Sequence, residues 1–307
     1  MLEWIHPLLI PMAFFYSFAA LIGIIGNAIM IIVFFKFKNL RSPCHYLITL
    51  TCFADMCHVS GQIVFVTHLF SNSTSSQSNC FYMIFIPCMG LCLGSPLIMV
   101  MGIDRMICCQ FPIFYRNVSS HPIIYTCLLL IFPFGCAFIL MYIAYLEKDP
   151  NPENQVVYVI PVAMRNRSFE YFNYSGGIIN VIIVILYGYT YFKLTSYSDT
   201  GGPKMRSVFK SILVTVIFVL FGWAITFIVN SISYKITSDP FISYIMQIYA
   251  GVSVNIALVC NVFVFYFINT DYRVCIKKLL HCSNAGDFES SDKMTIWNRN
   301  QEMVATK

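Results

Sequence analysis

The chain alternates between long apolar stretches and short polar ones. Seven such stretches recur along it, at roughly 7–35, 44–69, 81–108, 122–146, 172–195, 207–232 and 241–268. A helix that crosses the hydrocarbon core of a bilayer needs about 20 mostly apolar residues. Strands of a membrane barrel would be about 10 residues long with strict alternation, and these stretches are longer and do not alternate. The pattern therefore predicts an all-α membrane protein, a bundle of seven transmembrane helices.

Composition agrees with a surface that faces lipid. The 307 residues are 58% hydrophobic and only 11% charged, whereas soluble domains carry about 25% charged residues. The net charge of +5 is small and forms no basic patch with interleaved aromatics, so we expect no nucleic-acid partner. The 13 cysteines form no Cys-x-x-Cys pair, so we expect neither a metal site nor a cofactor.

Charge bias gives the orientation. With the N-terminus outside, fifteen of the 19 Lys and Arg residues fall on the inner side, as positively charged cytoplasmic loops require. Glycosylation sequons at Asn72, Asn166 and Asn173 fall outside, and the one at Asn117 falls inside as a chance match. The first stretch lacks a basic leading region and a small-residue cleavage site, so we interpret it as a helix rather than a signal peptide. We expect a multi-pass plasma-membrane protein with a cytoplasmic C-terminus.

We expect one seven-helix domain over residues 1–282, followed by a disordered cytoplasmic tail at 283–307. The segment after the seventh span predicts a short amphipathic eighth helix that lies along the membrane. Its apolar face, expected toward lipid, comprises Tyr272, Ile276 and Leu279 or Leu280. Cys275 and Cys282 flank this helix, and cysteines beside a membrane are candidates for acylation.

An acid and a base stand side by side at the inner end of the third span. Asp104 and Arg105 can form a local ion pair that a cytoplasmic partner would break. The alternative is that Arg105 only reaches the lipid headgroups. That alternative explains the arginine but leaves the adjacent acid unexplained, so we favour an activation switch.

Asp55 is the one acid well inside a span. A charge at mid-bilayer costs about 2.5–3.5 kcal/mol, so it needs polar partners, and Asn27 and Asn261 are the candidates. Two interpretations use the same bonds: an anchor that holds three helices together, or an activation hub. His58 follows at i+3, where a lone histidine is more often a packed bundle residue than a metal ligand.

Trp223, Phe227 and Asn230 share one face of the sixth span, at i, i+4 and i+7. Phe218 lies about a turn and a half further inward. Such a stripe is typical of either helix packing or a ligand site with a switch beneath it, and both interpretations stay open.

With these residues placed, the chain resembles the rhodopsin-like G-protein-coupled receptors. The matching motifs are Gly26-Asn27, Leu50 to Asp55, Asp104-Arg105-Met106, Phe218 with Gly222-Trp223, Asn261 to Phe265, and Tyr272-Arg273. Each motif is weak alone, but their order and spacing across seven spans are specific. The resemblance implies an extracellular small-molecule or peptide ligand, a heterotrimeric G protein as partner, and activation-switch roles for Asn27, Asp55, Asp104, Arg105, Phe218, Trp223 and Asn261.

A narrower match is with the nematode serpentine receptors of class Srsx. It rests on Gly102 to Arg105, Phe111 to Arg116, Gly222-Trp223 without a following proline, and Asp271-Tyr272-Arg273. The resemblance covers roughly residues 15–280. It implies a chemosensory or neuromodulatory receptor.

One departure concerns the disulfide that the receptor family forms. The resemblance implies a bond between Cys80, at the outer start of the third helix, and a cysteine in the second outer loop. No cysteine lies between Cys136 and Cys260, so that bond cannot form in this chain.

Other departures from the family pattern replace prolines that kink helices and residues whose oxygen atoms bind sodium. Ile225 and Val262 stand where the family has the sixth- and seventh-helix prolines, and Phe265 replaces a tyrosine. Gly94 and Ala257 occupy positions that the family tends to fill with oxygen-bearing residues. We therefore expect no sodium control at Asp55.

The ligand is expected between the helices near the outer face. Candidate liners are Cys88, Leu91, Trp223, Phe227, Asn230 and Asn255. Residues 81–93 carry no acid for an amine, and the seventh span has no lysine for a Schiff base. The lining residues predict a neutral or weakly polar small ligand. Arg165 and Arg167 leave open the alternative that the ligand is an acidic peptide.

Two other classes of membrane protein fit the sequence less well. A seven-span membrane hydrolase would need several intramembrane His or Asp residues, and only Asp55 and His58 are available. A transporter would show an internal repeat with helices broken at matching positions, and neither is evident. We therefore expect a receptor rather than an enzyme.

Overall fold

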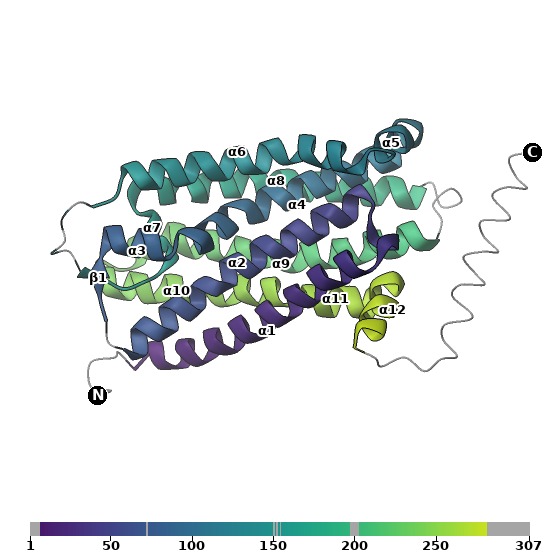
Figure 1. Ribbon diagram of the computed structural model, residues 1–307. Coiled ribbons are helices and arrows are strands. Elements are labelled where there is room, and N and C mark those ends of the chain that lie inside the picture. Colours follow the sequence, from purple (N-terminus) through teal and green to yellow (C-terminus); the bar gives the residue numbers. More distant parts are fainter. Residues whose placement is uncertain are drawn as a thin grey trace, which may run out of the picture.

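A computed structural model describes residues 7–71, 73–149, 151, 153, 155–196 and 203–280. Within these residues seven helices are long and apolar enough to cross a membrane, and they pack side by side in one bundle (Figure 1). Six are single helices: α1 (Leu9–Lys36), α2 (Pro43–Phe70), α4 (Phe85–Gln110), α6 (Pro122–Leu146), α8 (Asn166–Ser196) and α9 (Pro203–Ile236). The seventh span consists of α10 (Pro240–Val259) and α11 (Asn261–Ile268). The predicted fold class is confirmed.

Short elements cap both ends of the bundle. One end holds the strands β1 (Ser75–Ser76) and β2 (Gln155–Val156) with helices α3 (Gln77–Met83) and α7 (Ile160–Met164). We call it the strand end. The other holds η1 (Lys38–Leu40), α5 (Pro112–Ser119) and α12 (Thr270–Leu279), and we call it the α12 end (Figure 1). The two strands pair antiparallel, with Ser75 opposite Val156 and Ser76 opposite Gln155.

Helix starts follow from proline placement. Pro43, Pro112, Pro122 and Pro240 each stand in the first turn of a helix. Proline is favoured there because its fixed φ suits the helix and its missing N–H would have no intrahelical partner. These prolines therefore set where α2, α5, α6 and α10 begin.

Helix α4 lies at the centre of the bundle and is buried over most of its length, with Leu91, Leu97 and Met101 in the core. The outer helices turn large apolar side chains outward, as Phe14, Ile131 and Phe138 do. Apolar side chains on the outside would be costly in water and are favourable against lipid. The chain is a multi-pass membrane protein.

The seventh span breaks at Cys260 although it has no proline there. The Asn27 amide donates a hydrogen bond to the carbonyl oxygen of Leu258 at 3.2 Å. In a continuous helix that carbonyl would accept from the N–H of Val262. A side chain that bonds into the backbone ladder is one of the recognised causes of a helix kink.

The predicted lipid-facing surface of the eighth helix is wrong in part. Tyr272 and Ile276 are buried in α12, whereas Leu280 just beyond it is exposed. The Tyr272 ring packs 4.9 Å from Phe265 and 5.5 Å from His45, measured between ring centroids. The apolar face of α12 therefore packs against the bundle, because α2 and α11 offer it a closer apolar partner than lipid.

Candidate functional site

Asp55 is the centre of a buried polar hub that joins three helices. Asn261 donates to its carboxylate at 2.6 Å and to the side-chain oxygen of Asn27 at 3.3 Å. All three side chains are buried. The predicted partners are thus brought together. The anchor and the activation hub both need these bonds, so the geometry supports each equally.

Arg105 is held at the α12 end by two groups. Its guanidinium donates to the Asp104 carboxylate at 2.8 and 2.5 Å, and to the Tyr115 hydroxyl at 2.7 Å. The Asp104 side chain is fully buried. Such charge-assisted bonds are stronger than neutral ones, so the pair is more firmly held than a headgroup-seeking arginine would be.

Tyr115 is a partner that the sequence argument missed. It lies on α5, and burial raises the pKa of its hydroxyl above the ordinary value, so the group stays protonated and neutral. The signal was present in the chain, since Tyr115 is in the Phe111 to Arg116 segment that carries the family resemblance. What the sequence could not give is the turn that folds α5 back against α4.

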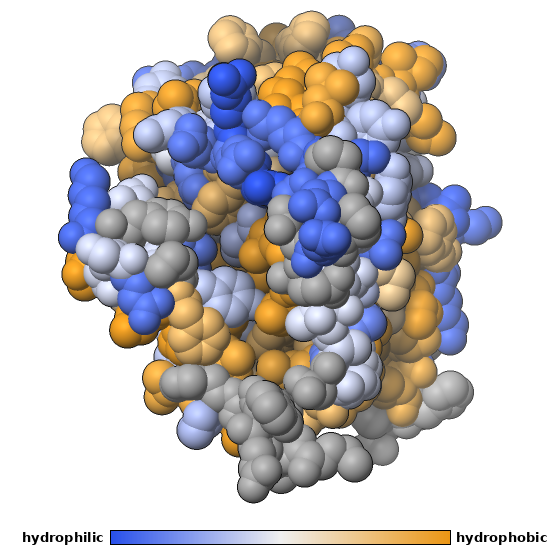
Figure 2. Space-filling view, turned by 90° about the vertical axis from the view of Figure 1, so that its left-hand side faces the viewer, coloured by the Kyte–Doolittle hydropathy of each residue, from blue (hydrophilic) through white to orange (hydrophobic). Residues whose placement is uncertain are grey.

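A cavity with a volume of about 100 Å³ opens at the strand end. Leu91, Trp223, Asn230 and Asn255 line it, as the sequence predicts. Cys88 is fully buried and is absent from its wall. Phe227 also stays behind the wall, where its ring stacks on Trp223 at 5.3 Å. Figure 2 looks onto this end of the molecule, where hydrophilic residues gather over the upper middle of the face and hydrophobic ones lie around them.

Several residues that line the cavity are not predicted by the sequence. The His58 ring stacks on Trp223, with centroids 6.2 Å apart and planes 28° apart. His58 therefore packs within the bundle, and its side chain is also part of the cavity wall. Gln62 and Gln247 add amides, and the loop residues Val159 to Pro161 close one side. Helical spacing finds faces of a helix but cannot find which loop lies over them.

The cavity offers neutral hydrogen-bonding groups. Its described lining residues contain no Asp, Glu, Lys or Arg. Asn255 Oδ1 and the Tyr244 hydroxyl are buried there without a hydrogen-bond partner among the described residues. Buried polar atoms nearly always have partners, so each of these two atoms can form a hydrogen bond with a molecule in the cavity.

Phe218 is not part of this cluster. Its side chain is 45% exposed on the outer surface of α9. Five residues separate it from Trp223, which places it about 140° away around a helix of 3.6 residues per turn. Its predicted switch role receives no support from this position.

The predicted modification sites are spread widely. Asn166 is exposed where α7 meets α8, in a left-handed conformation with φ of 44°. Asn173 is half-buried within α8, and its side-chain oxygen accepts from the Asn230 amide at 3.2 Å. That bond engages the amide to which a glycan would be attached. Cys275 is buried in α12. Asn72 and Cys282 lie outside the described residues, as does the predicted tail at 283–307.

Comparison with known proteins identifies relatives of the same kind. The family model described as serpentine type 7TM GPCR chemoreceptor Srsx matches residues 20–280. The chain is 30% identical over 113 residues to Olfactory receptor 1493 of Rattus norvegicus, which is 35% of each chain. It is 26% identical over 127 residues to Olfactory receptor 4E2 of Homo sapiens, 40% of each chain. The chain thus spans about a third to two fifths of the length of these curated relatives.

Proposed function

We propose that this chain, which belongs to the Srsx family of serpentine seven-transmembrane G-protein-coupled chemoreceptors, is a ligand-activated receptor. It binds a ligand in the strand-end cavity and activates a heterotrimeric G protein at the α12 end. The match to an olfactory receptor agrees with a chemosensory role. Members of this family are receptors rather than enzymes.

One observation carries the proposal. Helix α4 supplies Leu91 to the cavity and Arg105 to the buried pair at the opposite end. Fourteen residues of helix separate them, or about 21 Å at 1.5 Å per residue. A ligand that favours one position of α4 and α9 would shift the population of a two-state bundle. Arg105 would then leave Asp104 and Tyr115 for the G protein.

In this proposal the strand end faces the outside of the cell. The excess of Lys and Arg in the segments at the α12 end supports this, as does the exposed sequon at Asn166 near the strand end. Asn72 is a second glycosylation candidate, and Cys282 remains an acylation candidate beside the inner leaflet.

The ligand is a neutral or weakly polar small molecule. The cavity wall combines aromatic rings with amides and hydroxyls and carries no formal charge among its described residues. Arg165 already pairs with Asp149 at 2.6 Å, so it is less suited to meet an acidic peptide. Asn255 and Tyr244 supply the polar contacts, and Trp223 supplies a stacking surface.

A ligand screen in cells that carry a promiscuous G protein tests this function. We expect a second-messenger response to neutral small molecules that falls at least tenfold in potency in Trp223→Ala. The matched control is Phe221→Ala, because Phe221 lies on the same helix and is 69% exposed. A response that depends on the receptor but is equal in both variants would contradict the cavity as the binding site.

A further inference from the structure

The loop between α6 and α8 forms part of the cavity wall without a disulfide to hold it. Val159, Ile160 and Pro161 line the cavity, and we call residues 159–163 the lid segment. Cys80 contacts the loop through its thiol, which lies 3.9 Å from the Val157 carbonyl oxygen and also interacts with the backbone of Val159. Every cysteine that the structure describes is a free thiol. Something other than a covalent bond must therefore position the lid segment.

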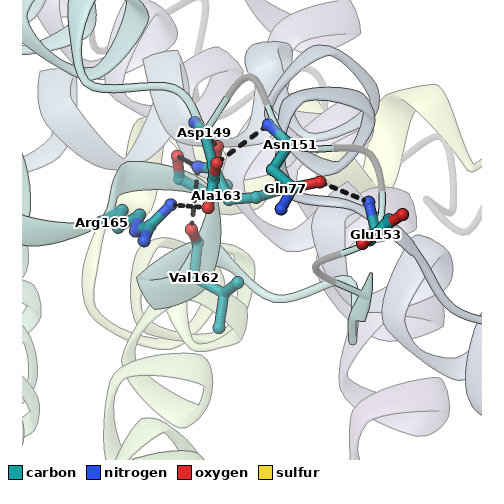
Figure 3. Close-up of polar contacts among 7 residues, drawn as sticks. All are labelled: Gln77, Asp149, Asn151, Glu153, Val162, Ala163 and Arg165. Atoms are coloured by element: carbon teal, nitrogen blue, oxygen red, sulfur yellow. Dashed lines mark hydrogen bonds and ion pairs between the residues drawn. The ribbon is translucent and has the colours of Figure 1, made fainter.

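Gln77 makes three hydrogen bonds to this loop from the first position of α3. Its Nε2 donates to the carbonyl oxygens of Val162 at 3.2 Å and Ala163 at 3.1 Å, and its Oε1 accepts from the N–H of Asp149 at 2.8 Å (Figure 3). The side chain is 2% exposed. One buried amide thus joins the beginning of the loop, just after α6, to its end in α7.

Other contacts support the loop from more exposed positions. Asp149 pairs with Arg165 at 2.6 Å, but the arginine side chain is 39% exposed. Exposed ion pairs contribute little because water and salt screen them. The Tyr158 ring stacks on His68 with centroids 3.7 Å apart, before the lid segment begins. Gln77 is therefore a buried polar side chain that makes two hydrogen bonds to the lid segment itself.

We propose that Gln77 is a positioning residue that takes the place of the missing disulfide and holds the lid segment against the ligand cavity. Its loss removes the hydrogen-bond partner of two loop carbonyls and one loop N–H at buried and half-buried positions, which is costly. The consequence for the ligand rests on the proposed function. The consequence for the loop does not.

Hydrogen–deuterium exchange of the purified full-length protein in lipid nanodiscs tests the clamp without any ligand. The reporters are the amides of Ala163 and Arg165, which bond to the carbonyls of Val159 and Pro161. We expect about tenfold faster exchange in Gln77→Met, equivalent to about 1.4 kcal/mol. Methionine keeps the length and removes all three bonds.

Two further variants sharpen the result. Gln77→Glu keeps an acceptor for the Asp149 amide but loses the donor to Val162 and Ala163, so exchange at the lid segment should again rise. Asn79→Met is the control, because Asn79 lies on the same helix and is exposed. Exchange unchanged from the wild type in Gln77→Met would overturn the proposal.

A covalent rescue keeps the test decisive if Gln77→Met reaches the membrane poorly. Cys80 Sγ lies 3.9 Å from the backbone carbonyl oxygen of Val157, so Val157→Cys is added as its disulfide partner and the bond is verified by mass. We expect the cross-linked double variant to recover slow exchange and surface level, and to lose both on reduction. A cross-link that forms without either recovery would contradict the clamp.

A second experiment tests the effect on ligand binding, with any neutral agonist found in the ligand screen described above. We expect Gln77→Met to speed its dissociation about tenfold while the maximal response stays near that of the wild type. An unchanged dissociation rate alongside faster exchange would show that the lid segment is clamped but does not control the ligand. A failed screen would leave the exchange result intact, so the clamp and the proposed function are tested separately.

Discussion

Asn261 donates a hydrogen bond to Asp55 at 2.6 Å, and this contact connects the start of α11 to the middle of α2. Asn261 directly follows the break at Cys260, so a change in the angle between α10 and α11 must change this bond. The hub is therefore placed where a movement of the seventh span would be felt by the rest of the bundle.

Asp55→Ala should weaken the ligand response more than it lowers surface expression. The variant removes a hydrogen bond to a buried carboxylate, a class of bond that contributes about 1.5–3 kcal/mol, and frees Asn261 from α2. Asp55→Asn keeps an oxygen for Asn261 and serves as the comparison. The measurements are agonist response and surface level of the same cells. An equal loss of both would favour the anchor.

Tyr115→Phe should raise ligand-independent signalling. The lost hydroxyl is one of the two groups that hold Arg105, and a hydrogen bond to a charged group contributes about 1.5–3 kcal/mol. The balance between resting and active states should shift about tenfold or more. Basal second-messenger output is compared at matched surface expression, with Phe114→Leu as control because Phe114 is exposed beside it. Basal output that stays at the wild-type level would contradict a holding role for Tyr115.

His58→Ala should lower agonist potency about two- to tenfold, because stacked aromatic pairs contribute about 0.5–1.5 kcal/mol. The sequence alone predicts little effect for this residue, whereas the structure places its ring on Trp223. Phe53→Ala, a change on the exposed surface of α2, is the control. Equal potency in the two variants would show that the stacking has no part in binding.

Cys80 should be inert and dispensable. Burial raises the pKa of its thiol to about 12, so the thiolate is about one part in ten thousand at pH 8 and appears only as the pH approaches 12. Maleimide at pH 8 should label Cys80 in the denatured protein and spare it in the folded one. Cys80→Ser should reach the surface at close to the wild-type level. Strong loss of surface protein would reveal a partner for this thiol.

The spans and the hub follow from the sequence for simple reasons. About 20 apolar residues in a row predict a membrane helix, and an acid inside a span needs polar partners. Asn27 and Asn261 were the available ones, and the structure brings them to Asp55. The face formed by Trp223 and Asn230 follows from helical spacing alone.

The remainder depends on contacts between distant parts of the chain. Gln77 meets residues 72 to 86 positions away, and no local pattern marks such a partner. Phe218 carries a motif resemblance yet lies on the outer surface of α9. Tyr272 has the spacing of a lipid-facing residue but is buried against Phe265. Periodicity gives the faces of each helix, and only packing decides what each face meets.

Topology is the most direct test of a receptor whose cavity faces outward and whose Arg105 end faces the G protein. Epitope tags at both ends are probed with antibody on intact and permeabilised cells, with Asn166→Gln as a glycan-shift control for the strand end. The account predicts that the N-terminal tag is labelled on intact cells and the C-terminal tag only after permeabilisation. Labelling of the C-terminal tag on intact cells would place the cavity inside the cell and contradict the account.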